Sequence, residues 1–553
     1  MTPESLAAAI QNAQETLRLN GLLAIDGQLP TPAVERPRNP DHGDYATNIA
    51  MVLAKRASLS PRELADAFAE QLRTNDDIES VDIAGPGFIN ITLATAAQGV
   101  LAEQIVEKAE DFGRGDLLAG TSFDVEFISA NPTGPLHLGH TRWAAVGDAL
   151  ARVLTAAGAQ VSKEFYVNDR GAQMDNFGLS IANAAEGKPP PEDGYHGAYI
   201  VELASEIIAE HPEYADLTGR ERFEAFREAG YERQFREHQQ VLDMFRTHFD
   251  VWTSERELHR SGAVEAGLNR LRDQGHVYEA DGALWLRTTS FGDDKDRVLI
   301  KADGELTYFA SDTAYYIDKR RRGFDVCVYL LGADHHGYVG RLRAVAACAG
   351  DDPEQNIEIP IGQLVKMMKG GQEVRLSKRA GNIVTLDEVV AEVGVDAARY
   401  QLIRYPVDSP LTLDLDLLVK RSNDNPVYYV QYAHARISSV LRNAAALGID
   451  WRATSLDPGL LGQPAESALL GALAEFPGIV AGAAELREPH RVARYLEDLA
   501  TAYHKFYDSC RVLPRGDAQP DGTSIARLWL CAATRQVLAN GLDLCGVSAP
   551  EQM

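Results

Sequence analysis

Two histidines three residues apart carry the clearest chemical signal in this sequence. His137 and His140 follow a turn-forming run at 131–135 (Asn-Pro-Thr-Gly-Pro) and precede an amphipathic segment, so we expect them at the start of a helix. A helix N-terminus offers unpaired N–H groups, and two imidazoles can donate hydrogen bonds to a phosphate oxygen as charge builds on it. Gly139 lets a flat ring approach the backbone. The pattern alone also arises around metals and in cores, but this setting favours a nucleotide phosphate site.

A basic loop at residues 375–382 is the second candidate for phosphate chemistry. It follows an apolar segment at 361–365 and the pair Gly370-Gly371, and it contains Arg375, Ser377 and Lys378. A mobile lysine that closes over ATP can stabilise the pentacovalent α-phosphate, a contact made mainly in the transition state. Most isolated basic loops are only solvated. Its position after the second half of a sheet favours the functional interpretation.

The elements around the two histidines predict an α/β core. Residues 124–128 read as a short strand, a long helix begins near His140, and a second strand spans 161–167. Strand, turn, helix and strand form a βαβ unit, so we expect a parallel, doubly wound sheet. The apolar run 326–331 is typical of a central parallel strand, and sheet texture also resumes at 283–288.

Four regions are predicted along the chain. Residues 1–115 form an α+β domain, with a half-buried strand at 88–93. Residues 116–370 form the sheet domain, interrupted by a polar, helical insertion at about 187–282. Residues 371–420 hold the basic loop, and residues 421–553 are expected to be helical with long loops near 456–463 and 514–522.

Composition narrows the class of protein. The 553 residues carry a net charge of −26, which alone disfavours a nucleic-acid partner, yet residues 421–553 hold 12 Lys and Arg against 14 Asp and Glu. This nearly neutral tail permits a polyanion there. Five scattered cysteines argue against a disulfide framework or a structural zinc site. We find no secretory signal at the start and no membrane span, so we expect a monomer in the cytoplasm.

Seven stretches of the sequence resemble one family. The run 126–140, Glu-Phe-Ile-Ser-Ala-Asn-Pro-Thr-Gly-Pro-Leu-His-Leu-Gly-His, is similar to the signature of arginyl-tRNA synthetases, which are class I aminoacyl-tRNA synthetases. Six further stretches resemble the bacterial type of this family in chain order: residues 42–48, 84–90, 166–171, 376–382, 428–436 and 546–553. The resemblance covers essentially the whole chain.

The resemblance implies a fold and a reaction. The fold is a Rossmann-like parallel sheet with an N-terminal α+β domain and a C-terminal all-α domain that binds the anticodon. The reaction is arginine–tRNA ligation with ATP and Mg²⁺, in which His137, His140 and Lys378 stabilise the transition state electrostatically. The implied contacts to ATP are His137, Gly139, His140, Gly332, His336, Arg375, Ser377 and Lys378. In this family arginine activation generally requires bound tRNA, which we carry over as a hypothesis.

The resemblance also implies an arginine site. Its residues are Glu126, Ser129, Asn131, His140, Tyr308, Asp312 and Asp334. Tyr308 and Asp312 are four apart, which places them on one face of a helix, and a guanidinium fork suits paired carboxylates. Without the resemblance, Asp312 reads as a surface acid and Tyr308 as core. The adjacent pair His335 and His336 lacks a third ligand at metal-binding spacing.

The basic loop departs from the family pattern. The family commonly reads Lys-Met-Ser-Lys, whereas this chain has Arg375 and Leu376 at the first two positions. Some members that lack signature lysines place one just before the histidine motif, where this chain has Gly134. Lys378 must therefore carry the role toward the α-phosphate, with Arg375 holding the β- and γ-phosphates as a fork.

The resemblance implies tRNA contacts from Gln431, Tyr432 and Arg436, which lie on a predicted amphipathic helix where Tyr and Arg can stack on bases. A tyrosine-rich stripe is more often core, and we expect several of these residues to be buried. The N-terminal domain resembles the family's module for the outer corner of tRNA, although its first 110 residues hold 8 Lys and Arg against 16 Asp and Glu. The basic run 319–322 faces tRNA phosphates or is a solvated helix end.

Two alternatives remain open at the level of sequence. One is another nucleotidyltransferase with the same histidine motif, or a class I synthetase for a different amino acid. Glu126 and Asp312 count against it, because a neutral substrate would leave two carboxylates unpaired. The other is a catalytically silent paralogue that only binds tRNA or a partner.

Overall fold

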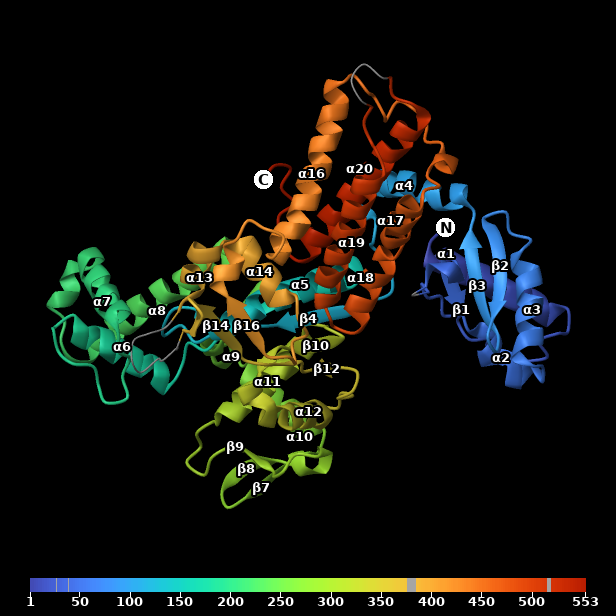
Figure 1. Cartoon of the computed structure of the whole chain (residues 1–553). Coiled ribbons are helices and arrows are strands. Elements are labelled where there is room, and N and C mark those ends of the chain that lie inside the picture. Colours follow the sequence, from blue (N-terminus) through green and yellow to red (C-terminus); the bar gives the residue numbers. More distant parts are fainter. Residues whose placement is uncertain (26, 38, 375–383, 515–518) are drawn as a thin grey trace.

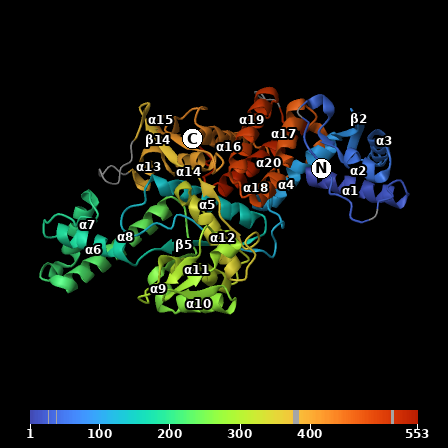
Figure 2. The same cartoon turned by 90° about the horizontal axis from the view of Figure 1, so that it is seen from below.

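The computed structural model describes residues 1–25, 27–37, 39–374, 384–514 and 519–553. The parts lie along an elongated molecule (Figures 1 and 2). The N-terminal domain is at one end, the helices of an insertion are at the other, and the parallel sheet with its covering helices lies between them. The C-terminal helices rise from the sheet domain on the side of the N-terminal domain.

The N-terminal domain packs helices on a small antiparallel sheet of order β1-β3-β2. Its elements are α1 (Pro3–Leu19), η1 (Pro40–His42), β1 (Tyr45–Thr47), α2 (Ile49–Ala57), α3 (Pro61–Leu72), β2 (Ile78–Ala84) and β3 (Phe88–Leu93). Reciprocal capping fixes where α3 begins, because the Ser60 side chain accepts from the backbone of Glu63 and the Glu63 carboxylate accepts from that of Ser60. The predicted strand at 88–93 is β3. Helix α4 (Thr95–Lys108) leads out of the domain.

A five-stranded, wholly parallel sheet is the core of the second domain and has the order β12-β10-β4-β5-β6. Its strands are β4 (Ser122–Glu126), β5 (Gln160–Val167), β6 (Val251–Ser254), β10 (Val326–Tyr329) and β12 (Ile357–Glu358). Helix α5 (Leu138–Ala156) links β4 to β5 and buries an apolar face that includes Trp143 and Leu150. The predicted βαβ unit and the class of fold are therefore confirmed.

The helical insertion differs from the predicted range of 187–282. The helices that project from the sheet are α6 (Ala172–Ala184), α7 (Ala198–Glu210) and α8 (Gly219–Met244), with the short η3 (Pro212–Ala215). Strand β6, inside the predicted insertion, pairs with β5 and belongs to the main sheet. After it come the helices α9 (Glu255–Arg260) and α10 (Ala263–Asp273).

The sheet texture at 283–288 belongs to a separate antiparallel sheet rather than to the main one. This small sheet has the order β7-β8-β9 and comprises β7 (Val277–Ala280), β8 (Ala283–Leu286) and β9 (Arg297–Ile300), with η4 (Thr288–Phe291). The chain then returns to the main sheet through α11 (Tyr308–Arg321). Beyond β10 lie β11 (Leu331–Gly332), η5 (Ala333–Tyr338), α12 (Val339–Cys348) and β13 (Ile361–Gly362).

The region of the basic loop forms a second small sheet, of order β15-β14-β16. Its elements are β14 (Val365–Lys369), β15 (Gln372–Glu373), α13 (Leu386–Val393), α14 (Val395–Ile403), β16 (Leu411–Asp414) and α15 (Leu415–Leu418). The C-terminal domain is helical, as predicted, with α16 (Pro426–Ala446), η7 (Pro458–Leu460), α17 (Pro464–Ala474), α18 (Phe476–Glu485), α19 (His490–Ser509) and α20 (Gly522–Leu544). The five cysteines are buried free thiols.

One stretch of the described residues, Pro464–Glu485, is long and apolar enough to cross a membrane by length and mean hydropathy. The chain folds it into two helices, α17 and α18, that meet at Glu475. Leucines 469, 470 and 473 of α17 are buried in the core of the helical domain. A core helix passes the same composition test, so this stretch is weak evidence for a membrane span.

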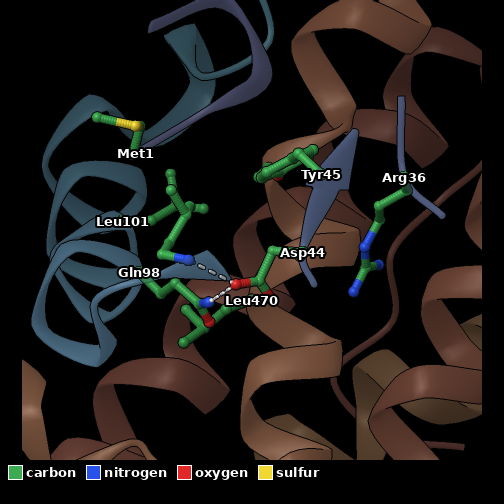
Figure 3. Close-up of a pocket in the computed structure, with 10 residues that line it drawn as sticks. Met1, Arg36, Asp44, Tyr45, Gln98, Leu101 and Leu470 are labelled. Atoms are coloured by element: carbon green, nitrogen blue, oxygen red, sulfur yellow. Dashed lines mark hydrogen bonds between the residues drawn. The ribbon is translucent and has the colours of Figure 1, made fainter. Parts of the chain in front are cut away.

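The N-terminal domain rests on the helical domain. A side chain at Gly471 of α17 would place its Cβ 2.4 Å from Cζ of Arg36, and Arg36 lies 3.8 Å from Glu475. Beside this contact, Asp44 accepts hydrogen bonds from the backbone of Leu93 and from the amide of Gln98 on α4 (Figure 3). The domain is thus seated on α17 and α4.

Candidate active site

His137 and His140 lie where they were expected, at the N-terminus of α5. His137 is the residue before the helix, and its Nδ1 accepts a hydrogen bond from the backbone of Gly139 at 3.1 Å. Nδ1 of His140 accepts from the backbone of His137 at 3.3 Å, and the two rings stack with centroids 4.0 Å apart. In the neutral ring an accepting Nδ1 leaves the proton on Nε2. Both rings can then donate toward a phosphate at the helix terminus.

Gly139 also has a structural role, in addition to leaving room for a ligand. A Cβ at this position would lie 2.9 Å from Cε1 and 3.1 Å from Nδ1 of His137. Any larger residue would therefore push the His137 ring out of its stacked position.

The segment behind the basic loop is hydrogen-bonded to the histidine motif. The backbone of Leu138 donates to the carbonyl of Val384 at 3.1 Å, and Leu386 donates to Leu136 at 2.9 Å. Thr385 is the capping residue of α13 and bridges to His137. Arg375, Ser377 and Lys378 lie outside the described residues.

The loop after β4 carries three of the predicted arginine contacts. Glu126 ends the strand and is buried, and its Oε1 accepts a hydrogen bond of 2.9 Å from Ser129. Ser129 has a positive φ of 44°, which places its hydroxyl to accept also from the backbone of Tyr166. The amide of Asn131 donates to Gln173 on α6. A strained, non-glycine backbone that holds polar side chains is typical of a functional site.

Tyr308 and Asp312 lie on one face of α11, as their spacing predicts. Tyr308 is 66% exposed, and a Cβ on Gly171 would lie 3.2 Å from its hydroxyl. Asp312 accepts a hydrogen bond from the hydroxyl of Tyr338 in η5. The pKa of Asp312 is raised to about 6, because burial and the charge of Glu126 outweigh the lowering effects of Tyr338 and Arg341.

Glu255 is a site residue that the sequence analysis missed. It is the first residue of α9, directly after β6, and is almost fully buried. Burial raises its pKa to about 7, Arg170 lowers it, and the charges of Asp312 and Asp169 raise it. A carboxyl whose ionisation is hindered by neighbouring carboxylates lies in a region that would favour a cation.

Asp169 fixes the position of Glu255. Its carboxylate accepts from the hydroxyl of Ser254 at 2.6 Å and from the backbone of Arg256 at 3.0 Å. Both donors flank Glu255 at the junction of β6 and α9. The end of β5 is thereby tied to the start of α9.

The segment after β10 is more exposed than the rest of the site. A Cβ at Gly332 would lie 2.5 Å from Oδ1 of Asp334, so a larger residue would displace the Asp334 side chain. The Asp334 side chain is 77% exposed and pairs with His335 at 3.5 Å. His336 is also exposed. The contacts of Asp334 within the described structure are therefore with its own loop rather than with Glu126 or Asp312.

The basic run at 319–322 is engaged within the protein. Lys319 is completely buried among carboxylates, Arg320 bonds Asp351, and Arg322 bonds Glu164. Neither sequence-level interpretation, a phosphate-facing run or a solvated helix end, describes these three side chains.

An aromatic surface lies on α16 and α19. The rings of Tyr428 and Tyr432 stack with centroids 6.1 Å apart, and Tyr432 also stacks with His504. The guanidinium of Arg436 lies 4.1 Å from the ring centre of Tyr507. Flat rings and a guanidinium plane at a surface suit unpaired bases.

Gln431 lies on the other side of α16 from this surface. It is buried, and its amide donates to Asp396 and to the carbonyl of Ser548. Its side chain therefore holds the C-terminal segment, and it does not join Tyr432 and Arg436 at the surface.

Comparison with known proteins finds matches to one family along the whole chain. The family models for the arginyl-tRNA synthetase N-terminal domain, the class I (R) tRNA synthetase catalytic domain and the DALR anticodon-binding domain match residues 3–93, residues 120–193 with 218–405, and residues 430–553. The arginine–tRNA ligases of Kineococcus radiotolerans and Frankia alni are 55% and 54% identical, each with 100% of both chains covered.

The fold is shared with solved structures. The arginyl-tRNA synthetase of Thermus thermophilus superimposes with a TM-score of 0.76 at 24% identity and covers 100% of both chains. Three matched domains and full-length relatives leave one assignment: the chain belongs to the arginyl-tRNA synthetase family of class I aminoacyl-tRNA synthetases.

Proposed function

We propose that this chain attaches L-arginine to its cognate tRNA in two steps. The carboxylate of arginine attacks the α-phosphate of ATP, which releases diphosphate and leaves arginyl-adenylate. A hydroxyl of the terminal tRNA adenosine then takes the arginyl group and releases AMP. The observation that carries this proposal is that Asp312, at the start of α11, and Glu255, at the start of α9, lie at the carboxyl edge of the sheet whose β4–α5 junction bears His137 and His140.

The phosphate side of the site consists of the two histidines and the basic loop. Nε2–H groups of His137 and His140 donate to the phosphates, while Gly139 keeps the rings stacked. Lys378, with Arg375 and Ser377, stabilises the charge on the phosphates of ATP. Gly332 and His336 complete the contacts to ATP. No protein nucleophile is required.

The metal enters with the nucleotide. Within the described ranges, no group of three or more His, Cys, Asp and Glu side chains is arranged to hold a metal ion. Mg²⁺ usually binds through one or two carboxylates together with substrate phosphates, and it neutralises phosphate charge when bound. The residues present therefore fit Mg²⁺ brought by ATP and held mainly by its phosphates.

The arginine side of the site is acidic. Asp312 and Glu255 face the guanidinium, which presents five donors in a planar fork and stays charged throughout the physiological range. Ser129 and Glu126 line the floor, with Asn131, Tyr308, His140 and Asp334 around the substrate. A neutral amino acid would leave buried carboxylates unpaired, so this cleft favours arginine over other substrates.

The tRNA contacts lie on the C-terminal and N-terminal domains. Tyr432 and Arg436 stack on anticodon bases from α16, and the N-terminal domain meets the outer corner of the tRNA. We further propose that the enzyme is a cytoplasmic monomer and that arginine activation requires bound tRNA. Rapid exchange of diphosphate into ATP with arginine but without tRNA would contradict this last point.

The direct test is to charge total tRNA with each of the twenty amino acids. Attachment of arginine alone supports the proposal, and attachment of another amino acid contradicts it. The Lys378→Ala variant separates a working enzyme from a silent paralogue. Loss of aminoacylation by about a hundredfold or more in this variant supports catalysis by the basic loop.

A further inference from the structure

Lys319 is a completely buried lysine that belongs to no substrate contact of the proposed site. Its Nζ lies 2.7 Å from Oδ1 of Asp124, 2.8 Å from Oε2 of Glu126 and 3.8 Å from Oε2 of Glu164. The ring centres of Tyr315 and Tyr329 are 4.6 and 4.5 Å away. A lysine is retained in a core only when its charge is paired. The buried charge of Lys319 is therefore paired with these carboxyl groups, and its role must act through them.

Strand register places the acidic side chains together. Glu126 of β4 is the partner of Glu164 on β5 and of Tyr329 on β10, so all three point to one face of the sheet. Asp124, two residues earlier, points to that face too. Like charges opposite one another on neighbouring strands are destabilising. Lys319 and Arg322 offset them, since Arg322 lies 2.6 Å from Glu164.

Protonation of Asp124 balances the cluster. Burial raises the pKa of Asp124 to about 8. Burial also raises the pKa of Glu164, but three other effects lower it to about 2. They are the charge of Lys319, a hydrogen bond with Asp124, and the charge of Arg322. Oδ2 of Asp124 accepts no hydrogen bond from the described residues and lies 3.7 Å from the guanidinium of Arg322. Lys319 and Arg322 supply two cations to the same three carboxyl groups.

Glu126 divides its two oxygens between Lys319 and the loop after β4. Oε2 is held by Lys319 from beneath, and Oε1 is held by Ser129, the strained residue of the loop that leads to Asn131. The same helix serves both sides. Tyr308, Asp312 and Lys319 recur on one face of α11 at spacings of four and seven, so the helix that brings two residues to arginine also inserts the lysine below.

We propose that Lys319 is a positioning residue for amino-acid recognition, which holds Oε2 of Glu126 and so keeps Oε1 turned toward Ser129 and the arginine site. The inference rests on the proposed function, because arginine is the substrate that the cleft binds. Lys319 touches neither ATP nor arginine in this role. It acts through the orientation and charge of Glu126.

The charged and titratable groups around Lys319 come from every element packed against it. They are Asp124 and Glu126 on β4, Glu164 on β5, Tyr315 and Arg322 from α11 and its C-terminal end, and Cys327 and Tyr329 on β10. Burial alone would lower the pKa of Lys319, but Asp124, Glu126 and Glu164 raise it above its ordinary value. The lysine therefore stays charged at every pH at which the enzyme works.

The test is aminoacylation by the Lys319→Met variant. Without the cation, two adjacent buried glutamates cannot both stay ionised near neutral pH, and one binds a proton. We expect KM for arginine to rise about tenfold or more while KM for ATP stays within about twofold. The acid limb of the pH profile of kcat/KM for arginine should move upward by about one pH unit or more. A shared rise in both KM values would indicate a merely structural role and overturn the proposal.

A double-mutant cycle with Glu126→Gln gives the decisive comparison. If Lys319 acts through Glu126, Lys319→Met adds nothing to KM for arginine in the Glu126→Gln background. The double variant keeps the buried charge balanced, because one anion and one cation are removed together. It therefore carries the test even if Lys319→Met alone does not fold. Additive effects in the cycle would overturn the proposal.

Asp124→Asn is the matched control. It alters another carboxyl that touches Lys319 at 2.7 Å, but it replaces a protonated group by an amide of the same shape. KM for arginine at pH 7 should change by less than about twofold, and a rise equal to that of Lys319→Met would contradict the proposal. Failure of the wild-type chain to charge arginine at all would contradict the proposed function instead. The two failures are thus distinguishable.

Discussion

The guanidinium of Arg399 donates a hydrogen bond of 2.6 Å to the carboxylate of Asp148, and both side chains are completely buried. Asp148 lies on α5, the helix that carries the histidine motif, and Arg399 lies on α14. Arg399 also donates to the carbonyls of Phe245 and Cys545, the latter at the end of the helical domain. One charge pair therefore joins the catalytic helix to the C-terminal part of the chain.

Asp148→Asn should lower the free energy of unfolding by about 3 kcal/mol, because removal of one partner leaves a buried guanidinium without its anion. Burial would raise the pKa of Asp148, but Arg399, Arg152 and Lys163 hold it below the ordinary value. A carboxyl with a lowered pKa in the fold stabilises above its unfolded pKa and loses this effect as pH falls.

The difference in stability between wild type and Asp148→Asn should therefore be full at pH 6 and shrink below about pH 4. Unfolding midpoints from circular dichroism at several pH values measure it. Asp111→Asn is the control, since its exposed pair with Arg114 should contribute little. A difference that stays constant down to pH 3 would contradict the prediction.

Gly139→Ala should lower kcat for aminoacylation by about tenfold to a hundredfold, because the new Cβ meets the His137 ring at 2.9 Å and displaces it from the phosphate. Stability should hardly change, since alanine favours helices over glycine. Gly482→Ala in α18, where a Cβ meets nothing within 4 Å, is the matched control. Equal activity of the two variants would remove the proposed role of the ring.

Asp312→Asn should reduce kcat/KM for arginine by about a hundredfold, as expected for loss of one partner of a desolvated charge pair. In the wild type, Asp312 with a pKa of about 6 and Glu255 with a pKa of about 7 are ionised only above these values. Because both carboxyls must be ionised to bind the guanidinium, kcat/KM for arginine should fall as pH drops from 8 to 5. The pH profile measured with Glu255→Gln should lose its upper inflection, and an unchanged profile would exclude Glu255.

Tyr432→Ala should raise KM for tRNA by about tenfold, since one base-stacking contact is worth about 1–3 kcal/mol. KM for arginine and for ATP should not change. Tyr432→Phe retains the ring that stacks on Tyr428 and His504 and should behave like the wild type. A defect in Tyr432→Phe equal to that in Tyr432→Ala would show that the hydroxyl, rather than the ring, is what matters.

Local patterns predicted much of the catalytic core. The β4–α5–β5 unit could be read from the sequence because turn residues at 131–135 separate an apolar strand from an amphipathic helix. Strand β6 could not, because its four residues are only half-buried at the sheet edge and follow a polar helix. Its place is decided by pairing with β5, which is a tertiary interaction.

The same limit explains the residues that were missed or misread. Glu255 is a single acid in a polar stretch, and only the pairing of β5 with β6 brings it near Asp312. Lys319 looked like part of a basic run, because charge density in a sequence does not show which way a side chain points. Its spacing of seven from Asp312 places it on the same helix face as that residue, and this was a signal only once the resemblance had placed Asp312 at the arginine site.

The seat of the N-terminal domain has a consequence for the size of the RNA that fits. Arg36 packs against Gly471 on the helical domain, so the part proposed to meet the outer corner of tRNA and the part proposed to meet the anticodon share one support. The shared support sets the distance between these two proposed tRNA-binding regions. That distance selects an RNA by the separation of its outer corner from its anticodon loop, before any base is contacted.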